Sequence, residues 1–153
     1  MSTTDKMHCM SIYTCYVDEM RKGVKQFELR KYDPNIEPGQ WVLIYETLPT
    51  GSVGAAFKAG DTLISDPEYF WLNYRAVLGI DEEPYFKYFR GKAKSYAVEI
   101  DEFVEFEPIG LDELRRQYGF RAPQGVVRVN EPLRSVIESL VCPKRTEGVQ
   151  SGL

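Results

Sequence analysis

The stretch GVKQFELR, residues 23–30, holds the side chains that are best suited to chemistry. Lys25, Glu28 and Arg30 bring an ammonium, a carboxylate and a guanidinium close together in the chain. A carboxylate accepts hydrogen bonds, while a guanidinium fork or an ammonium donates them. The three groups could therefore form the polar wall of a binding cleft.

The pattern around these residues predicts a strand over 25–31. Polar and apolar residues alternate there, which places Phe27 and Leu29 on the core face and Glu28 and Arg30 on the other. In a regular strand Lys25 would share the core face, but the preceding glycine permits a bend that re-aims it. One alternative stays open, in which Glu28 and Arg30 form an exposed ion pair worth about 0–1 kcal/mol and bind nothing.

The spacing G-x-K-x-x-E-x-R is met by Gly23, Lys25, Glu28 and Arg30. A predicted helix that ends in KG precedes the motif, and GQWVLIYET follows it. This order resembles the ASCH superfamily, a group of small PUA-like β-barrels. The downstream stretches YAVEI and EPIGLDELR resemble the later strand and helix of archaeal-type ASCH proteins, so the resemblance covers residues 10–141.

The resemblance implies a cleft between the barrel and the first helix, lined by the motif, of the kind thought to bind RNA or a nucleobase. We expect Lys25, Glu28 and Arg30 to bind the ligand. Three further candidates are Lys22, Gln124 on the loop RAPQG, and Tyr45, which together with Tyr13 could offer a plane for base stacking. The expected partner is a short single-stranded RNA, a nucleotide or a nucleoside.

Whether the domain is an enzyme stays open at this point. Some ASCH-like enzymes hydrolyse the amide of N4-acetylcytidine with a threonine nucleophile three positions after the motif lysine, where this chain has Glu28. A carboxylate cannot replace that hydroxyl, so a hydrolase acting on RNA or on an N-acylated nucleoside would use Glu28 as a general base, aided by Lys25. A protein-interaction domain with a vestigial cleft is a further alternative.

The net charge and its distribution along the chain limit the kinds of partner that the protein can bind. The net charge is −4, which argues against a broad basic face for duplex DNA. Basic residues are nevertheless concentrated in the segments 21–31 and 87–94, while 95–108 holds acidic residues and no lysine or arginine. A two-signed surface can still attract a small anionic ligand to one side.

The cysteines and the histidine exclude several kinds of site. Cys9, Cys15 and Cys142 lack metal-ligand spacing and are expected to be free thiols, and His8 is the only histidine. A histidine-based zinc site and a Ser-His-Asp triad are thus excluded, and we expect neither a metal nor a cofactor. No apolar run is long enough to cross a bilayer and no secretory leader is visible, which predicts a cytoplasmic protein without membrane association.

The elements that must position the motif follow from periodicity and turn residues. Strands are predicted over 10–13, 25–31, 41–46, 55–64, 94–107 and within 120–129, and helices over 14–23, 66–79, 81–91, 110–119 and 131–141. Gly60 predicts a bulge in its strand, and Thr14 and Asp66 are expected N-caps. The pattern indicates an α+β fold, a small and mostly antiparallel barrel with peripheral helices. One domain is expected over 9–142, between a flexible N-terminus (1–8) and a flexible tail (143–153).

Overall fold

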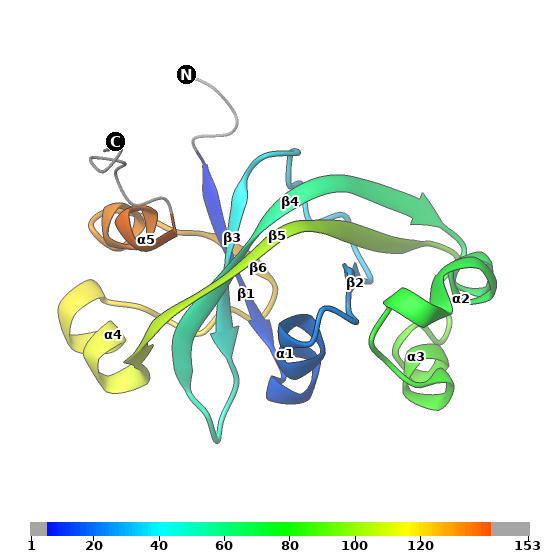
Figure 1. Ribbon diagram of the computed structural model, residues 1–153, viewed down its shortest axis with the longest axis horizontal. Coiled ribbons are helices and arrows are strands. Elements are labelled where there is room, and N and C mark those ends of the chain that lie inside the picture. The colour runs from blue at the N-terminus through cyan, green and yellow to red at the C-terminus, as the bar shows by residue number, and fades with distance from the viewer. Residues whose placement is uncertain (1–5, 142–153) are drawn as a thin grey trace, which may run out of the picture.

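The computed structural model describes residues 6–141 as one curled sheet with helices around it (Figure 1). The strands are β1 (Met7–Ile12), β2 (Phe27–Arg30), β3 (Trp41–Glu46), β4 (Ser52–Ser65), β5 (Ser95–Gly110) and β6 (Val126–Arg128). Their order in the sheet is β2-β5-β4-β3-β1-β6. The long antiparallel pair β4–β5 crosses the whole molecule and joins its two ends (Figure 1).

The helices gather in three places around this sheet (Figure 1). They are α1 (Thr14–Arg21), α2 (Pro67–Tyr74) with the 3-10 turn η2 (Arg75–Val77), α3 (Glu82–Tyr88), α4 (Leu111–Tyr118) and α5 (Leu133–Val141). Helices α4 and α5 lie at one end, α2 and α3 at the other, and α1 lies between them. None of the helices in residues 6–141 is both long and apolar enough to span a membrane.

The apolar core is divided among these three places. Leu114 of α4 and Ile137 of α5 pack with Leu43 on one face of the sheet. Val17 of α1 packs against the opposite face, in a cluster that includes Ile44. A third cluster joins the core face of β2 to α2, η2 and α3, and its buried members include Phe27, Leu29, Phe70, Leu78 and Tyr85. The alternation predicted for β2 is therefore confirmed.

The sheet is mixed, which corrects the expected barrel in one respect. Strand β1 pairs parallel with β3, whereas β1–β6, β2–β5, β3–β4 and β4–β5 are antiparallel. A parallel pair needs a long crossover, and α1, β2 and the following loop supply it between β1 and β3. Strands β2 and β6 end the sheet order, so no recorded pairing closes the sheet of residues 6–141 into a full barrel.

Two local predictions are confirmed, and the predicted cap of α1 is wrong. The bulge is present, because the β4–β5 register shifts around Gly60, where an added Cβ would lie 2.4 Å from Glu99 Oε1. Asp66 caps α2 by accepting a hydrogen bond from Tyr69 N at 2.9 Å. The cap of α1 is Tyr13 rather than Thr14, whose hydroxyl instead bonds to that of Thr50.

Some helices and strands begin or end at other residues than the sequence predicted. The helix predicted over 66–79 ends early and continues as the 3-10 turn. Strand β1 begins at Met7, so His8 lies in a strand and not in a flexible start. The remaining terminal predictions, including the tail 143–153 and the thiol of Cys142, lie outside the described residues.

Candidate functional site

A cleft of about 940 Å³ lies where α1, β2, α3 and the loop before β6 meet. One wall carries the three motif groups of Lys25, Glu28 and Arg30. The lining also includes Tyr13, Tyr16, Tyr32 and Tyr88 as aromatic residues, Lys31 and Lys87 as cations, and Gln124 as an amide. The structure therefore brings most of the predicted site residues to one cavity.

The turn between α1 and β2 places the motif lysine. Gly23 adopts a φ of 78°, which reverses the chain after the helix. The backbone N–H of Lys25 then donates to Glu19 O at 3.0 Å, so this residue still belongs to the turn. Strand β2 begins two residues later, at Phe27. The bend expected at the glycine thus lets Lys25 leave the core face and reach the cleft.

Lys25 is a buried cation. Its side chain is 4% exposed, and Nζ donates to Leu78 O at 2.9 Å. The same nitrogen lies 3.9 Å from Glu28 Oε1. Burial lowers the pKa of Lys25, the charge of Glu28 partly opposes this, and Arg30 lowers it further.

A glycine that the motif does not contain makes this position possible. Gly79 follows Leu78 with a φ of 65°, and a Cβ added there would lie 2.5 Å from the Cβ of Lys25. In the sequence, Gly79 signals only the end of a helix. Its importance for the position of Lys25 becomes visible only when the two segments are packed together.

Glu28 and Arg30 form an ion pair on the cleft wall. Arg30 Nη1 lies 3.1 Å from Glu28 Oε2, with side-chain exposures of 16% and 7%. The alternative of a pair in open solvent is therefore wrong, because both side chains are largely shielded from water. This is the one hydrogen bond recorded for the Arg30 guanidinium among residues 6–141.

Gln124 is in the cleft lining, but two other predicted residues lie elsewhere. Tyr45 is buried on the opposite face of the sheet, where its ring centroid is 5.6 Å from that of Phe120. Lys22 is not among the residues that line the cleft, is largely exposed and donates to Glu19 Oε2 at 3.0 Å. Of the two tyrosines suggested for base stacking, Tyr45 is thus excluded by its burial, and the exposed Tyr13 lines the cleft.

The rim holds aromatic and basic residues that the motif did not identify. Tyr32 is exposed beside β2, and Lys92 Nζ lies 4.2 Å from its ring centroid and 2.7 Å from its hydroxyl oxygen. Lys31 Nζ lies 4.7 Å from the ring centroid of Tyr88. The basic run 87–94 was the sequence signal for this rim, but it did not reveal which aromatic residues it would meet.

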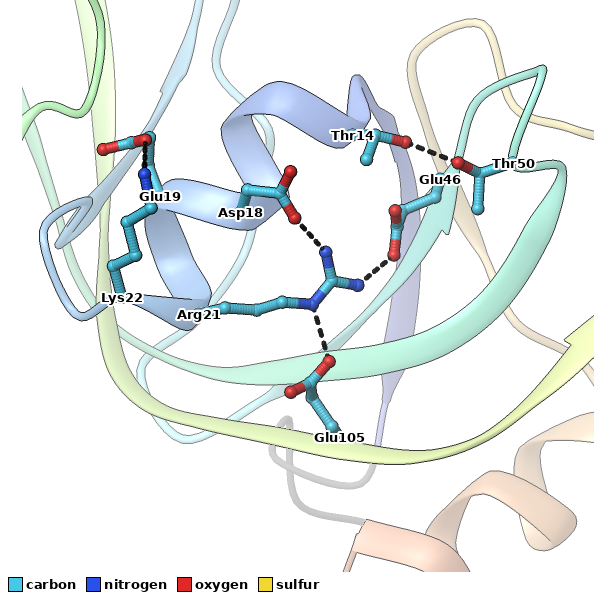
Figure 2. Close-up of polar contacts among 8 residues, drawn as sticks. All are labelled: Thr14, Asp18, Glu19, Arg21, Lys22, Glu46, Thr50 and Glu105. Carbon is cyan, nitrogen blue, oxygen red and sulfur yellow. Dashed lines mark hydrogen bonds and ion pairs between the residues drawn. The ribbon is translucent and has the colours of Figure 1, made fainter.

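A second charged cluster lies at the end of α1, around Arg21 (Figure 2). Its Nη1 donates to Asp18 at 2.6 Å, its Nε to Glu105 at 2.6 Å, and its Nη2 to Glu46. Burial lowers the pKa of Arg21, but the hydrogen bonds to these carboxylates outweigh it and raise the pKa above the ordinary value. This arginine ties α1 to β3 and β5.

Residues that could hold a metal do not come together. Within residues 6–141 no group of three or more His, Cys, Asp or Glu side chains is arranged to bind a metal ion. Cys9 and Cys15 are both free. Burial raises the pKa of the Cys9 thiol to about 12, which disfavours the thiolate form at neutral pH.

Comparison with known structures identifies the fold. A crystal structure of ASCH from Zymomonas mobilis matches with a TM-score of 0.81 and 24% identity, over 89% of this chain and 96% of that one. A serine-to-alanine variant of it matches equally well over 90% and 97%. A tyrosine-to-phenylalanine variant gives a TM-score of 0.79 and 22% identity over 90% and 98%. No family model and no curated protein matches the sequence. The structural likeness extends over nearly the whole chain, which therefore has the fold of an ASCH domain.

Proposed function

We propose that the cleft beside β2 binds one base of a nucleotide or short single-stranded RNA through Lys25, Glu28 and Arg30. The observation that carries this proposal is the convergence of three charged side chains, none more than 16% exposed, on one wall of a cavity of about 940 Å³. Keeping charges out of water is costly, and such groups in a concave site are typical of ligand recognition.

The aromatic and basic rim supports the same ligand. Unpaired bases stack on tyrosine rings, and Tyr13 and Tyr32 are both exposed in the cleft lining. Lys31 and Lys87 line the cleft as well and can meet the phosphates on either side of the bound base. The resemblance to the ASCH superfamily adds support, since clefts of that group are thought to bind RNA.

The footprint should be small. The net charge of −4 and the few cations at the rim leave no room for an extended phosphate track. We expect the logarithm of affinity to fall with the logarithm of salt concentration at a slope that corresponds to about one to three phosphates.

A fluorescence-anisotropy titration tests this function. A labelled single-stranded RNA of about six nucleotides is titrated with wild type, Arg30→Ala and Arg116→Ala at several salt concentrations. Arg116 lies exposed on α4 outside the cleft and matches the lost charge. Arg30→Ala loses one charge-assisted contact, so its RNA affinity should be about tenfold or more below that of wild type. Arg116→Ala should bind RNA like wild type. Absence of binding at low salt, or an equal loss in both variants, would refute the proposal.

Hydrolysis at the same cleft is a second candidate, favoured by the lowered pKa of Lys25 next to the carboxylate of Glu28. In that role Glu28 removes a proton from the attacking water, and Lys25 stabilises the negative charge that develops. Wild type and Glu28→Gln are each incubated with RNA and with N-acylated nucleosides, and the mixtures are separated by chromatography. Product should appear with the wild type and not with the variant. Turnover that survives Glu28→Gln would exclude this base.

A further inference from the structure

The order of charges along the cleft wall has a consequence for base identity. Glu28 lies between two cations, with Lys25 Nζ 3.9 Å from Oε1 and Arg30 Nη1 3.1 Å from Oε2. Read along the wall, the groups are a donor, an acceptor and a donor. A base that lies edge-on against them must offer an acceptor, a donor and an acceptor.

Building on the proposed function, we propose that this wall selects uracil among the four bases of RNA. The Watson–Crick edge of uracil carries O4, N3–H and O2, which is the complementary order. N3–H would donate to Glu28, and the two carbonyl oxygens would accept from Lys25 and Arg30.

The other three bases each meet a mismatch on the same wall. Cytosine and adenine present an unprotonated ring nitrogen where uracil presents N3–H, and its lone pair would face the Glu28 carboxylate. Guanine donates from N1 but also presents its 2-amino group where the wall has a cation. A buried polar group left unpaired in this way is costly, and a site built to hydrogen-bond one edge rejects the analogue that lacks it.

The three side chains retain the bonding capacity that this role needs. An ammonium has three donors, and Lys25 uses one on Leu78 O. The guanidinium of Arg30 has five N–H groups, one of which is bonded to Glu28. A carboxylate has about four lone-pair sites, so Glu28 can accept from a ligand while it keeps Arg30.

The wall is also held in place before any ligand arrives. The Leu78 carbonyl fixes the end of Lys25, and the backbone of Lys25 is itself fixed by its bond to Glu19 O. Glu28 lies in a paired strand opposite Val98. Such pre-organisation is what allows a hydrogen-bonding edge to discriminate between ligands.

A panel of trinucleotides tests the inference on the wild-type protein. The trimers differ only in their central base, which is uracil, cytosine, adenine, guanine or N3-methyluracil, and their affinities are compared by competition. We expect the uracil trimer to bind about tenfold or more tighter than the others, including N3-methyluracil, because each lacks the donor or meets a mismatch. Equal affinities, or tightest binding of any other base, would overturn uracil selection and leave RNA binding intact. Absence of binding by all five would instead overturn the proposed function.

The variant Glu28→Gln provides the second arm. Its amide can turn to offer either the carbonyl oxygen to N3–H of uracil or the amino group to N3 of cytosine. The ratio of uracil to cytosine affinity should therefore fall about tenfold or more, with the folded state checked by circular dichroism. An unchanged ratio in a folded variant would contradict the role of Glu28, and an unfolded variant would leave the trinucleotide panel on wild type as the deciding result.

Discussion

Two arginines on either side of the α1–β2 turn are surrounded very differently. Arg21 donates from Nε, Nη1 and Nη2 to three carboxylates that come from α1, β3 and β5. Arg30 donates from one nitrogen to Glu28, and a second cation, Lys25, shares that carboxylate. In the first cluster acidic groups outnumber the cation, and in the second the cations outnumber the acid.

This difference separates a structural cluster from a binding one. All three nitrogens of Arg21 are bonded within the fold, so little capacity is left for a ligand, and the hollow of about 470 Å³ beside it is lined by Glu46, Glu105 and Glu107 as well. Arg30 and Lys25 retain donors on the wall of a larger cleft. The degree of pairing in the folded chain, rather than residue type, indicates which cluster binds.

The largest expected effect is on stability, from Arg21→Ala. The substitution leaves Glu46, whose side chain is 6% exposed, without its cation. We expect the free energy of unfolding to fall by about 2–4 kcal/mol, measured by urea denaturation, while RNA affinity of the folded variant stays close to wild type. For Arg30→Ala we expect a smaller loss of stability, because Lys25 Nζ still lies 3.9 Å from Glu28 Oε1, together with a clear loss of RNA affinity. A variant pair that behaved alike in both measurements would contradict the distinction between the clusters.

The second-largest effect, on both stability and RNA binding, is expected for Gly79→Ala. An added Cβ would clash with the Cβ of Lys25 at 2.5 Å, and the φ of 65° is unfavourable for alanine. The matched control is Gly91→Ala, where φ is 77° and an added Cβ meets nothing within 4 Å. Both variants carry the backbone cost of about 1 kcal/mol. Only Gly79→Ala should lose a further 1–3 kcal/mol or so and bind RNA more weakly, whereas equal effects would exclude a role for Gly79 in positioning Lys25.

The third prediction concerns how the stability of the protein depends on pH. Burial lowers the pKa of Lys25 in the folded protein below its ordinary value of 10.5, so the unfolded chain holds more protons in the window between these two values. The free energy of unfolding therefore gains a term from Lys25 that rises with pH through this window. Urea denaturation should show that the free energy of unfolding of wild type rises relative to that of Lys25→Met as pH rises toward 10.5. A difference that is independent of pH would contradict the burial of the ammonium.

The smallest effect is expected for Lys22→Ala. Lys22 lies outside the cleft, and its hydrogen bond to Glu19 raises its pKa, in contrast to the burial that lowers the pKa of Lys25. Since an exposed charge acts only through screened, long-range attraction, RNA affinity should change by less than about twofold. A loss as large as that of Arg30→Ala would place Lys22 in the binding site after all.

The sequence predicted the motif and its strand well, because both depend on local signals. Alternation around Phe27 and Leu29 identified the two faces of β2, and Gly23 indicated the bend that re-aims Lys25. The mixed sheet could not be predicted in this way, since a period of two marks a strand but not the direction of its partner.

The missed and misplaced site residues share one cause. Strand β3 is apolar on both faces, so its pattern could not show that Tyr45 faces the core opposite the cleft. Gly79 matters for a contact with Lys25, far away in the chain. Tyr32 and Tyr88 meet basic partners across similar separations. Each of these relations exists only in the folded chain.

The most direct test of ligand binding in this cleft is an NMR titration of the isotope-labelled protein with a uracil-containing trinucleotide. We expect amide shifts to concentrate on the segments that line the cleft, which are residues 11–16, Lys25, 28–35, 84–88 and 124–126. The amides of Arg21 and Glu105 should stay unchanged, because neither residue lines the cleft. Shifts confined to the Arg21 cluster, or spread evenly over the surface, would show that the ligand does not bind in the cleft beside β2.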